Sequence, residues 1–182
     1  MTQSDDRTPR IEVIFPADVI QDRIVALARD IAGTSPDTLL VVAVLKGSFV
    51  FAADLIRAMH TVGLRPEVDF ITLSSYRDSM RSSGTVSILR DLDLDVTDRD
   101  VLLVDDILES GRTLAFAKDL ISARGARSIS TCVLLDKPGR RNAEIEADFK
   151  AFDCPDVFVV GYGMDLAYSF RQLPFVGRVI QE

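Results

Sequence analysis

Hydrophobic and polar residues alternate with two different periods in the first part of the chain. Residues 11–15 (IEVIF) predict a short strand, and residues 17–33 predict a helix because apolar residues recur there at near-helical spacing before a glycine. The apolar positions of this helix are Val19, Ile24, Leu27 and Ile31. Residues 38–47 (TLLVVAVLKG) are almost continuously apolar, which predicts a strand that is covered on both faces.

A second helix is predicted over residues 48–63, again from apolar residues that share one stripe. The stripe consists of Phe49, Ala52, Ala53, Ile56 and Met59. Residues 67–76 and 85–92 are rich in β-branched and aromatic residues, so they predict two strands. The polar segment between these strands predicts a long hairpin loop.

The rest of the chain again alternates strands with helices or loops. Residues 100–106 (DVLLVDD) predict a strand, residues 111–125 predict a helix, and residues 128–140 and 156–165 each predict a strand followed by a polar loop. This alternation predicts an α/β fold, in which a parallel sheet has helices on both faces. Ligands bind such sheets beyond the carboxyl ends of the strands. The polar residues expected there are Lys46, Gly47, Ser48, residues 105–113, Asp136, Lys137 and Asp165.

Length and composition limit the class of protein. The chain has 182 residues, 47% of them hydrophobic and 27% charged, which fits one globular domain over residues 1–182 with a flexible tail up to about residue 10. No apolar run reaches the roughly 18 residues that a membrane span needs, and the polar N-terminus does not resemble a secretory signal. We therefore expect a cytoplasmic protein with no membrane partner.

Charge and the scarcity of metal-binding side chains exclude further classes. Two cysteines and one histidine are too few for a thiol or imidazole metal cluster. The formal net charge is -7, whereas a nucleic-acid backbone needs a basic face, so no nucleic-acid partner is expected. A phosphate bound by this chain is therefore expected to be small.

The segment VLLVDDILESGRTL, residues 101–114, combines two kinds of binding group. Asp105 and Asp106 follow a strand, and carboxylates accept hydrogen bonds from sugar hydroxyls or from the water around a divalent cation. Residues 110–113 (SGRT) lead into a helix, whose N-terminal amides and hydroxyls favour a phosphate. A sugar phosphate would satisfy both parts. The alternative is that the acids only solvate the first turn of the helix.

The same segment resembles the phosphoribosyl pyrophosphate signature of type I phosphoribosyltransferases. The chain from about residue 11 to its end is similar, in the same order of segments, to the hypoxanthine (guanine) phosphoribosyltransferase family. The segments are VAVLKGSFVFAADL, VDFITLSSY, the signature, LLDKPGRR and PDVFVVGYGMDLAYSFRQLPFVG. The resemblance implies a parallel sheet flanked by helices, with a small hood formed by the N- and C-terminal segments.

The resemblance also implies an activity. The family transfers phosphoribosyl from 5-phosphoribosyl 1-pyrophosphate (PRPP) to a purine, releasing pyrophosphate, with Mg²⁺ holding the donor. This chain would act in purine salvage on hypoxanthine to give IMP, with guanine and xanthine as further candidates. The partners implied are these small molecules and further copies of the chain in a homodimer or homotetramer.

Residues of this chain match the family's donor-binding positions. Asp105 and Asp106 match the acids that hold the ribose hydroxyls, and Asp165 matches the ligand of Mg²⁺. The turn for the 5-phosphate is matched by Ser110, Gly111, Arg112 and Thr113. The pyrophosphate contacts are matched by Lys46, Gly47 and Arg171, and the peptide bond between Leu45 and Lys46 can be cis in the family. Alternatively, Lys46 and Arg171 are surface charges and Asp165 caps a helix.

Other residues match the purine site and the catalytic base. Lys137 would donate to the oxygen at purine position 6, Phe158 would stack on the base, and Val159 would supply backbone contacts. Ser75 and Tyr76 match the start of a lid. Glu109 occupies the position of the general base at purine N7, where the family commonly has Asp, so the reach of its carboxylate differs.

Two other classes share parts of this pattern. Receiver domains also contain an acid pair after an apolar strand, but they place it after their first strand, whereas four predicted strands precede Asp105 here. A regulatory protein of the phosphoribosyltransferase fold that binds nucleic acid is the stronger alternative. The acidic balance and the presence of Lys137, Asp165 and Arg171 favour an enzyme.

Overall fold

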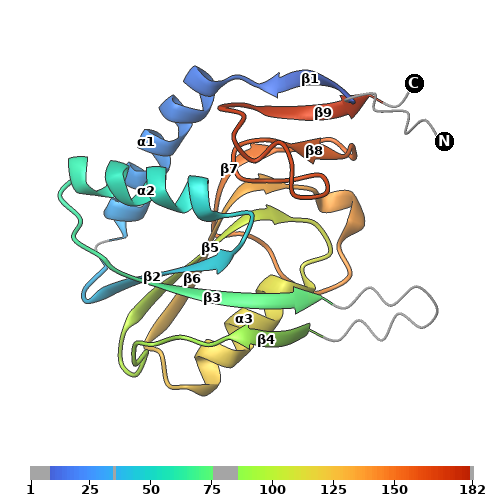
Figure 1. Cartoon of the computed structure of the whole chain (residues 1–182). Helices are drawn as coiled ribbons and strands as arrows, with labels where there is room; N and C mark the ends of the chain where they lie inside the picture. The colour runs from blue at the N-terminus through green and yellow to red at the C-terminus, as the bar shows by residue number, and fades with distance from the viewer. Residues whose placement is uncertain (1–8, 35, 76–85, 181–182) are drawn as a thin grey trace.

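The chain folds into a six-stranded sheet with helices on both faces and a small second sheet at one end (Figure 1). The computed structural model describes residues 9–34, 36–75 and 86–180. The strands of the large sheet are β2 (Leu39–Leu45), β3 (Glu67–Ser75), β4 (Val86–Arg90), β5 (Asp100–Leu108), β6 (Ser128–Asp136) and β7 (Phe149–Asp153). The helices are α1 (Ala17–Gly33), α2 (Phe49–Thr61) and α3 (Arg112–Ala123), with a short 3-10 turn η1 (Pro138–Arg140).

The large sheet has the order β4-β3-β2-β5-β6-β7 and is parallel except at one edge. β2 lies between β3 and β5, and its Leu40 pairs with Glu67 on one side and Val101 on the other. β4 is antiparallel to β3, as the predicted hairpin requires. These pairings confirm the predicted α/β fold, and the carboxyl ends of β2 and β5 lie next to each other.

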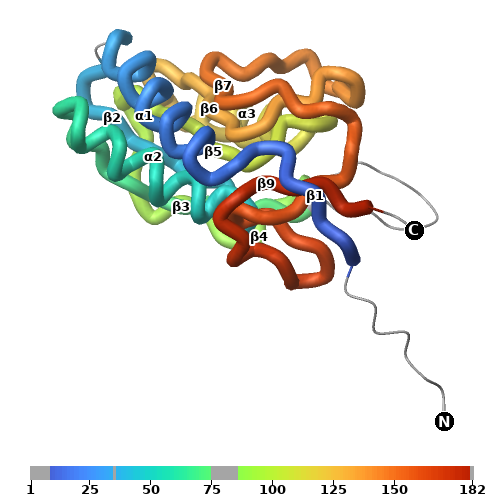
Figure 2. The backbone as a smooth tube through the Cα atoms, turned by 90° about the horizontal axis from the view of Figure 1, so that it is seen from above, coloured from blue at the N-terminus to red at the C-terminus, as the bar shows by residue number. Residues whose placement is uncertain are grey.

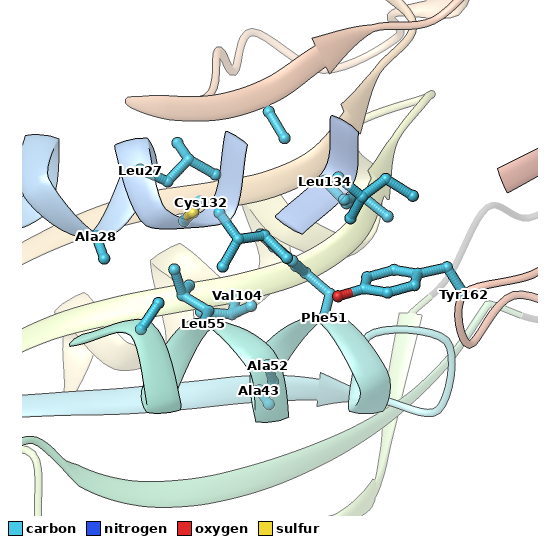
Figure 3. Close-up of a cluster of buried hydrophobic side chains, with 14 of the residues drawn as sticks. Leu27, Ala28, Ala43, Phe51, Ala52, Leu55, Val104, Cys132, Leu134 and Tyr162 are labelled. Atoms are coloured by element: carbon cyan, nitrogen blue, oxygen red, sulfur yellow. The ribbon is translucent and has the colours of Figure 1, made fainter. Parts of the chain in front are cut away.

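Helices on both faces explain why β2 is apolar throughout. Val41 and Ala43 of β2 belong to the core cluster that packs with α1 and α2. Leu40, Val42 and Val44 belong to the opposite cluster, which packs with α3. Because side chains of a strand alternate between its faces, a strand that is covered twice has no position for a polar residue. Figure 3 shows the first of these cores between α1, α2 and the sheet.

The second sheet joins the two ends of the chain. It consists of β1 (Arg10–Phe15), β9 (Val176–Ile180) and β8 (Val159–Val160), in the order β1-β9-β8. β1 and β9 are antiparallel and pair from Arg10–Ile180 to Phe15–Val176. In Figure 2 these strands cross one end of the molecule. We call this sheet, with the segment from Gly161 to Phe175 that joins its strands, the hood; it confirms the hood that the family resemblance implies.

At the C-terminal side, one prediction was wrong and one strand was missed. Residues 156–165 were predicted as a strand of the main sheet followed by a polar loop, but only Val159 and Val160 form a strand, and it pairs with β9 in the hood. The strand ends because the next three residues, Gly161, Tyr162 and Gly163, all have positive φ angles. The sixth strand of the large sheet is instead β7, which was not predicted and pairs with β6.

The predicted buried stripe of α2 was also partly wrong. The buried residues of this helix are Phe51, Ala52, Leu55, Ala58 and Met59. Phe49 is 45% exposed, and Val19, a predicted apolar position of α1, is 44% exposed. Since α2 is apolar on more than one face, its periodicity does not select the face that packs on the sheet.

Candidate active site

A cavity of about 230 Å³ lies where β2 and β5 end. Its walls come from the β2–α2 turn, the end of β5 and the turn that begins α3. It contains most of the residues that the sequence predicts for donor binding and catalysis. These are Lys46, Gly47, Asp105, Asp106, Glu109, Ser110, Gly111 and Thr113. Polar loops therefore converge at the carboxyl edge of the sheet, as the topology requires.

Asp105 and Asp106 form a closely spaced acid pair in the wall of this cavity. The Asp106 N–H donates to Asp105 Oδ1 over 2.9 Å, and the Ile107 N–H donates to Asp106 Oδ1 over 3.0 Å. Burial and the neighbouring negative charge of Asp106 raise the pKa of Asp105 well above its ordinary value. Burial also raises the pKa of Asp106, although its hydrogen bonds and the charge of Arg171 act in the opposite direction. The pair therefore favours partners that donate hydrogen bonds or carry positive charge.

The turn between β2 and α2 packs directly on this acid pair. A side chain at Gly47 would place its Cβ 1.8 Å from Asp106 Oδ2, so only glycine fits. The peptide bond between Leu45 and Lys46 is cis, as the family resemblance suggests. Ser48 is fully buried and donates to the Val44 carbonyl over 2.5 Å, which holds the turn against the end of β2. Lys46 is exposed at the rim.

The turn from Ser110 to Thr113 presents the N-terminus of α3 to the cavity. Gly111 is the residue before the helix and has a φ angle of 80°, which is in the left-handed region. An added Cβ there would lie 2.6 Å from Ile145 Cγ2. The first amides of a helix have no partner within the helix, so they are available to an anion. The Arg112 side chain is exposed and does not line the cavity, so only its backbone belongs to this turn.

Glu109 lies between the acid pair and the predicted purine site. Its Oε1 is 3.7 Å from Lys137 Nζ and 3.5 Å from Arg140 NH1. Lys137 is only 6% exposed, and its Nζ donates to the Val157 carbonyl over 2.7 Å. Because an ammonium group has three hydrogens, this arrangement leaves Lys137 able to donate to a further acceptor.

The hood carries a charged pair, Asp165 and Arg171. Arg171 NH2 is 2.8 Å from Asp165 Oδ1, and Arg171 NH1 donates to the Gly163 carbonyl over 2.7 Å. Asp165 Oδ2 accepts from the Tyr168 N–H over 2.7 Å. A Cβ at Gly163 would lie 2.3 Å from the Gly47 carbonyl oxygen, so the hood touches the β2–α2 turn. Asp165 and Arg171 thus contact each other beside that turn.

Phe158 and Val159 directly follow Val157, whose carbonyl accepts from Lys137. Phe158 is 54% exposed, as a ring that receives a ligand must be, and its carbonyl accepts from the Val179 N–H in the hood. Val159 is buried in β8. Ser75 is the last residue of β3, and Tyr76 lies outside the described residues, so the predicted lid lies beyond the part that the structure describes.

Sequence reasoning missed one residue next to Glu109, which is Arg140. Arg140 follows Lys137 in the KPGR segment, and its Nε also lies 2.6 Å from Asp156 Oδ1. Arg140 and Lys137 therefore flank the same carboxylate with positive charge. The 3-10 turn at Pro138–Arg140 follows the end of β6 and brings Arg140 beside Glu109. The sequence did not indicate which arginine would contact Glu109.

Within residues 9–34, 36–75 and 86–180, no group of three or more His, Cys, Asp or Glu side chains is arranged to hold a metal ion by itself. Within the same described ranges, no helix has the length and the apolar composition needed to cross a membrane.

The fold and the edge site define a class of protein: a phosphoribosyl transferase domain, whose family model matches residues 16–167. A hypoxanthine phosphoribosyltransferase from Escherichia coli is 44% identical over 173 residues, which are 93% of this chain and 96% of the relative. A hypoxanthine-guanine phosphoribosyltransferase from Bacillus subtilis is 44% identical over 91% of both chains.

Solved structures agree with these relatives. The crystal structure of a hypoxanthine phosphoribosyltransferase from Staphylococcus aureus has a TM-score of 0.87 at 37% identity, with 93% of this chain and 91% of that chain covered. A hypoxanthine-guanine phosphoribosyltransferase from Bacillus anthracis, with a HEPES molecule in its active site, has a TM-score of 0.88 at 38% identity and 95% and 100% coverage. The chain belongs to the phosphoribosyltransferase family, in its hypoxanthine phosphoribosyltransferase group.

Proposed function

We propose that this enzyme transfers the phosphoribosyl group of PRPP to hypoxanthine, giving IMP and pyrophosphate in purine salvage. Guanine and xanthine are the other candidate acceptors. One observation carries the proposal: the Asp105–Asp106 pair and the N-terminus of α3 line the same cavity of about 230 Å³. A carboxylate pair binds hydroxyls and helix amides bind phosphate, so the cavity suits the two ends of a ribose 5-phosphate.

The donor binds, in this proposal, between the sheet edge and the hood. Asp105 and Asp106 accept hydrogen bonds from the ribose hydroxyls, and the turn of Ser110, Gly111, Arg112 and Thr113 binds the 5-phosphate. Lys46, the Gly47 amide and Arg171 bind the pyrophosphate. A guanidinium suits this role because it donates two parallel hydrogen bonds to phosphate oxygens.

The purine binds on the Lys137 side. Lys137 donates to the oxygen at position 6, which favours oxopurines over adenine, because the amino group of adenine cannot accept this hydrogen bond. Phe158 stacks on the ring, and the Val159 backbone contacts its edge. The burial of Lys137 supports this assignment, since a buried ammonium with a remaining donor recognises an acceptor strongly.

Glu109 acts as the general base. Its carboxylate takes the proton from purine N7 while the attacking ring nitrogen bonds to the anomeric carbon and the bond from that carbon to pyrophosphate breaks. The anomeric carbon becomes cationic as the leaving group departs, as in glycosidic cleavage, and the negative acid pair nearby stabilises that charge.

Magnesium fits the donor set of this site. Mg²⁺ is commonly held by one or two carboxylates together with substrate phosphates, and it needs no complete cage of protein ligands. Asp165 offers a carboxylate that is 29% exposed beside Arg171, next to the proposed pyrophosphate position. When bound, the ion would neutralise charge on the pyrophosphate as it leaves.

We also propose that residues 1–182 form a single domain, that the chain assembles as a homodimer or homotetramer, and that it acts in the cytoplasm. Sedimentation should then give a mass two or four times the 20.1 kDa of one chain. A monomeric mass at micromolar concentration would contradict the assembly.

A purine panel tests the proposed activity. The protein is incubated with PRPP and Mg²⁺ and with hypoxanthine, guanine, xanthine or adenine, and nucleotide and pyrophosphate are measured. We expect equal amounts of IMP and pyrophosphate with hypoxanthine and no AMP with adenine. No turnover with any oxopurine, together with tight, salt-sensitive binding of nucleic acid, would instead support the regulatory alternative.

A further inference from the structure

A buried tyrosine connects the hood to the two helices on one face of the sheet. Tyr162 is only 3% exposed, and its hydroxyl donates to Asp54 Oδ2 of α2. The same oxygen accepts from Gln21 Nε2 of α1 over 3.1 Å, and Asp54 Oδ1 pairs with Arg57. In Figure 3 the Tyr162 ring extends from its loop toward Phe51 on α2.

The ionisation states of this pair suit a strong hydrogen bond. Burial raises the pKa of the Tyr162 hydroxyl, and the contact with Asp54 raises it further, so the hydroxyl remains a donor. Burial alone would raise the pKa of Asp54, but the hydrogen bonds from Tyr162, Arg57 and Gln21 lower it overall, so the carboxylate remains charged. A hydrogen bond to a charged acceptor is stronger than one between neutral groups.

Tyr162 lies at the start of the hood segment that carries Asp165 and Arg171. Its φ angle of 50° lies between those of Gly161 (93°) and Gly163 (101°). Non-glycine residues adopt this region only where their surroundings impose it. The Tyr162 N–H donates to the Leu173 carbonyl over 2.9 Å, and the Gly163 N–H donates to the Arg171 carbonyl over 3.0 Å.

A shift at Tyr162 would therefore reach the donor site through Gly163. The Gly163 carbonyl accepts from Arg171 NH1, and the Gly163 Cα packs on the Gly47 carbonyl. Gly47 in turn packs on Asp106. Gly163 thus touches both the proposed pyrophosphate arginine and the proposed pyrophosphate turn.

We infer that the Tyr162–Asp54 hydrogen bond is a positioning device for PRPP binding: it fixes Gly163, and through it the relative placement of Arg171 and the Lys46–Gly47 turn. This inference rests on the proposed function, because it assigns pyrophosphate to these groups. The purine contacts at Lys137 and Phe158 lie on another part of the site, so they depend less on this pair.

The test is Tyr162→Phe, which removes the hydroxyl and keeps the ring. We expect the KM for PRPP and its Kd, measured by calorimetry with Mg²⁺ present, to rise about threefold to tenfold, the effect of one lost hydrogen bond. The KM for hypoxanthine should change less than twofold. Tyr168→Phe is the matched control, because it removes a hydroxyl from a hood tyrosine that is 85% exposed, and it should change neither constant.

Asp54→Asn is the second variant, and it keeps an acceptor for the hydroxyl while it removes the charge. It should weaken PRPP binding less than Tyr162→Phe does. In the double variant, the loss of PRPP affinity should be no larger than the sum of the losses in the two single variants. A lower melting temperature with unchanged PRPP constants in both variants would overturn the inference, and so would an equal rise in both KM values. Absence of turnover in the unaltered enzyme would contradict the proposed function, whereas the calorimetric Kd values would still decide the inference.

Discussion

Glu109 is one of the positions at which this chain differs from the residue that the family resemblance leads us to expect. Its longer side chain ends 3.5 Å from Arg140 and 3.7 Å from Lys137. These two contacts limit where the Glu109 carboxylate can reach. These contacts hold the longer glutamate side chain in place, so the proposed role as a base does not require the shorter side chain of aspartate.

Glu109→Gln removes the proposed base and keeps the size of the side chain. We expect kcat to fall about 100-fold or more, because general acid–base groups commonly contribute this much. The KM for PRPP should change little. Steady-state kinetics with hypoxanthine measure both constants, and Glu109→Asp, which retains a carboxylate, is the control. Near-normal turnover of the glutamine variant would show that Glu109 is not the base.

Lys137→Ala tests the assignment of the purine oxygen contact. The KM for hypoxanthine should rise at least tenfold, since a buried acceptor would lose a charged donor. Lys118→Ala removes a lysine from α3, outside the cavity lining, and should leave this constant unchanged. A Lys137→Ala enzyme with the same KM for hypoxanthine as the unaltered enzyme would exclude the contact.

The raised pKa of Asp105 predicts that its contribution to the stability of the fold depends on pH. Its folded pKa is raised by burial and by Asp106, so the folded protein holds this proton more tightly than the unfolded chain does. The contribution of the group to stability is therefore most favourable below the ordinary carboxyl pKa of about 4 and is lost as the pH rises through the raised value.

Asp105→Asn should consequently raise the melting temperature by a few degrees at pH 7.5 while it lowers activity. The gain should shrink as the pH falls toward 4. Thermal unfolding followed by circular dichroism at several pH values measures this dependence. A variant that is less stable than the parent at pH 7.5 would contradict the raised pKa.

At the scale of elements, the helices and strands that could be predicted are those marked by signals within their own sequence. The bounds of α1 were predicted correctly, because its apolar spacing and final glycine are local signals. β7 was missed because only one of its five residues is buried, so it has no clear apolar pattern. The strand β8 was assigned to the wrong sheet because apolar residues alone do not indicate which of two sheets a strand joins.

The turn before α3 is the element on which the proposed 5-phosphate site depends. Gly111→Ala should lower the free energy of unfolding by about 1–2 kcal/mol or more, because alanine is unfavourable at a positive φ and its Cβ would meet Ile145. The KM for PRPP should also rise. Denaturant unfolding measures the first effect and kinetics the second.

Gly33→Ala is the matched control, because nothing lies within 4 Å of the added Cβ at the end of α1. It should leave stability unchanged or raise it by up to about 1 kcal/mol, the helix propensity difference. Equal stability of the two variants would contradict the role given to the Gly111 turn.

At the scale of the molecule, the site exists only where distant segments meet. The acid pair and the phosphate turn are adjacent in sequence, so that half could be predicted from residues 101–114 alone. The other contacts of the site join segments that are far apart in the chain or lie across a turn. Gly47 packs on Asp106, Gly163 packs on Gly47, and Arg140 contacts Glu109. Sequence reasoning named most of these residues through the family resemblance, but their mutual contacts required coordinates.

A crystal structure with IMP bound tests the central claim most directly. The account predicts ribose hydroxyls within hydrogen-bond distance of Asp105 and Asp106, and the 5-phosphate against the amides of Ser110 to Thr113. The nucleotide bound elsewhere, or both carboxylates turned away from the ribose, would contradict it.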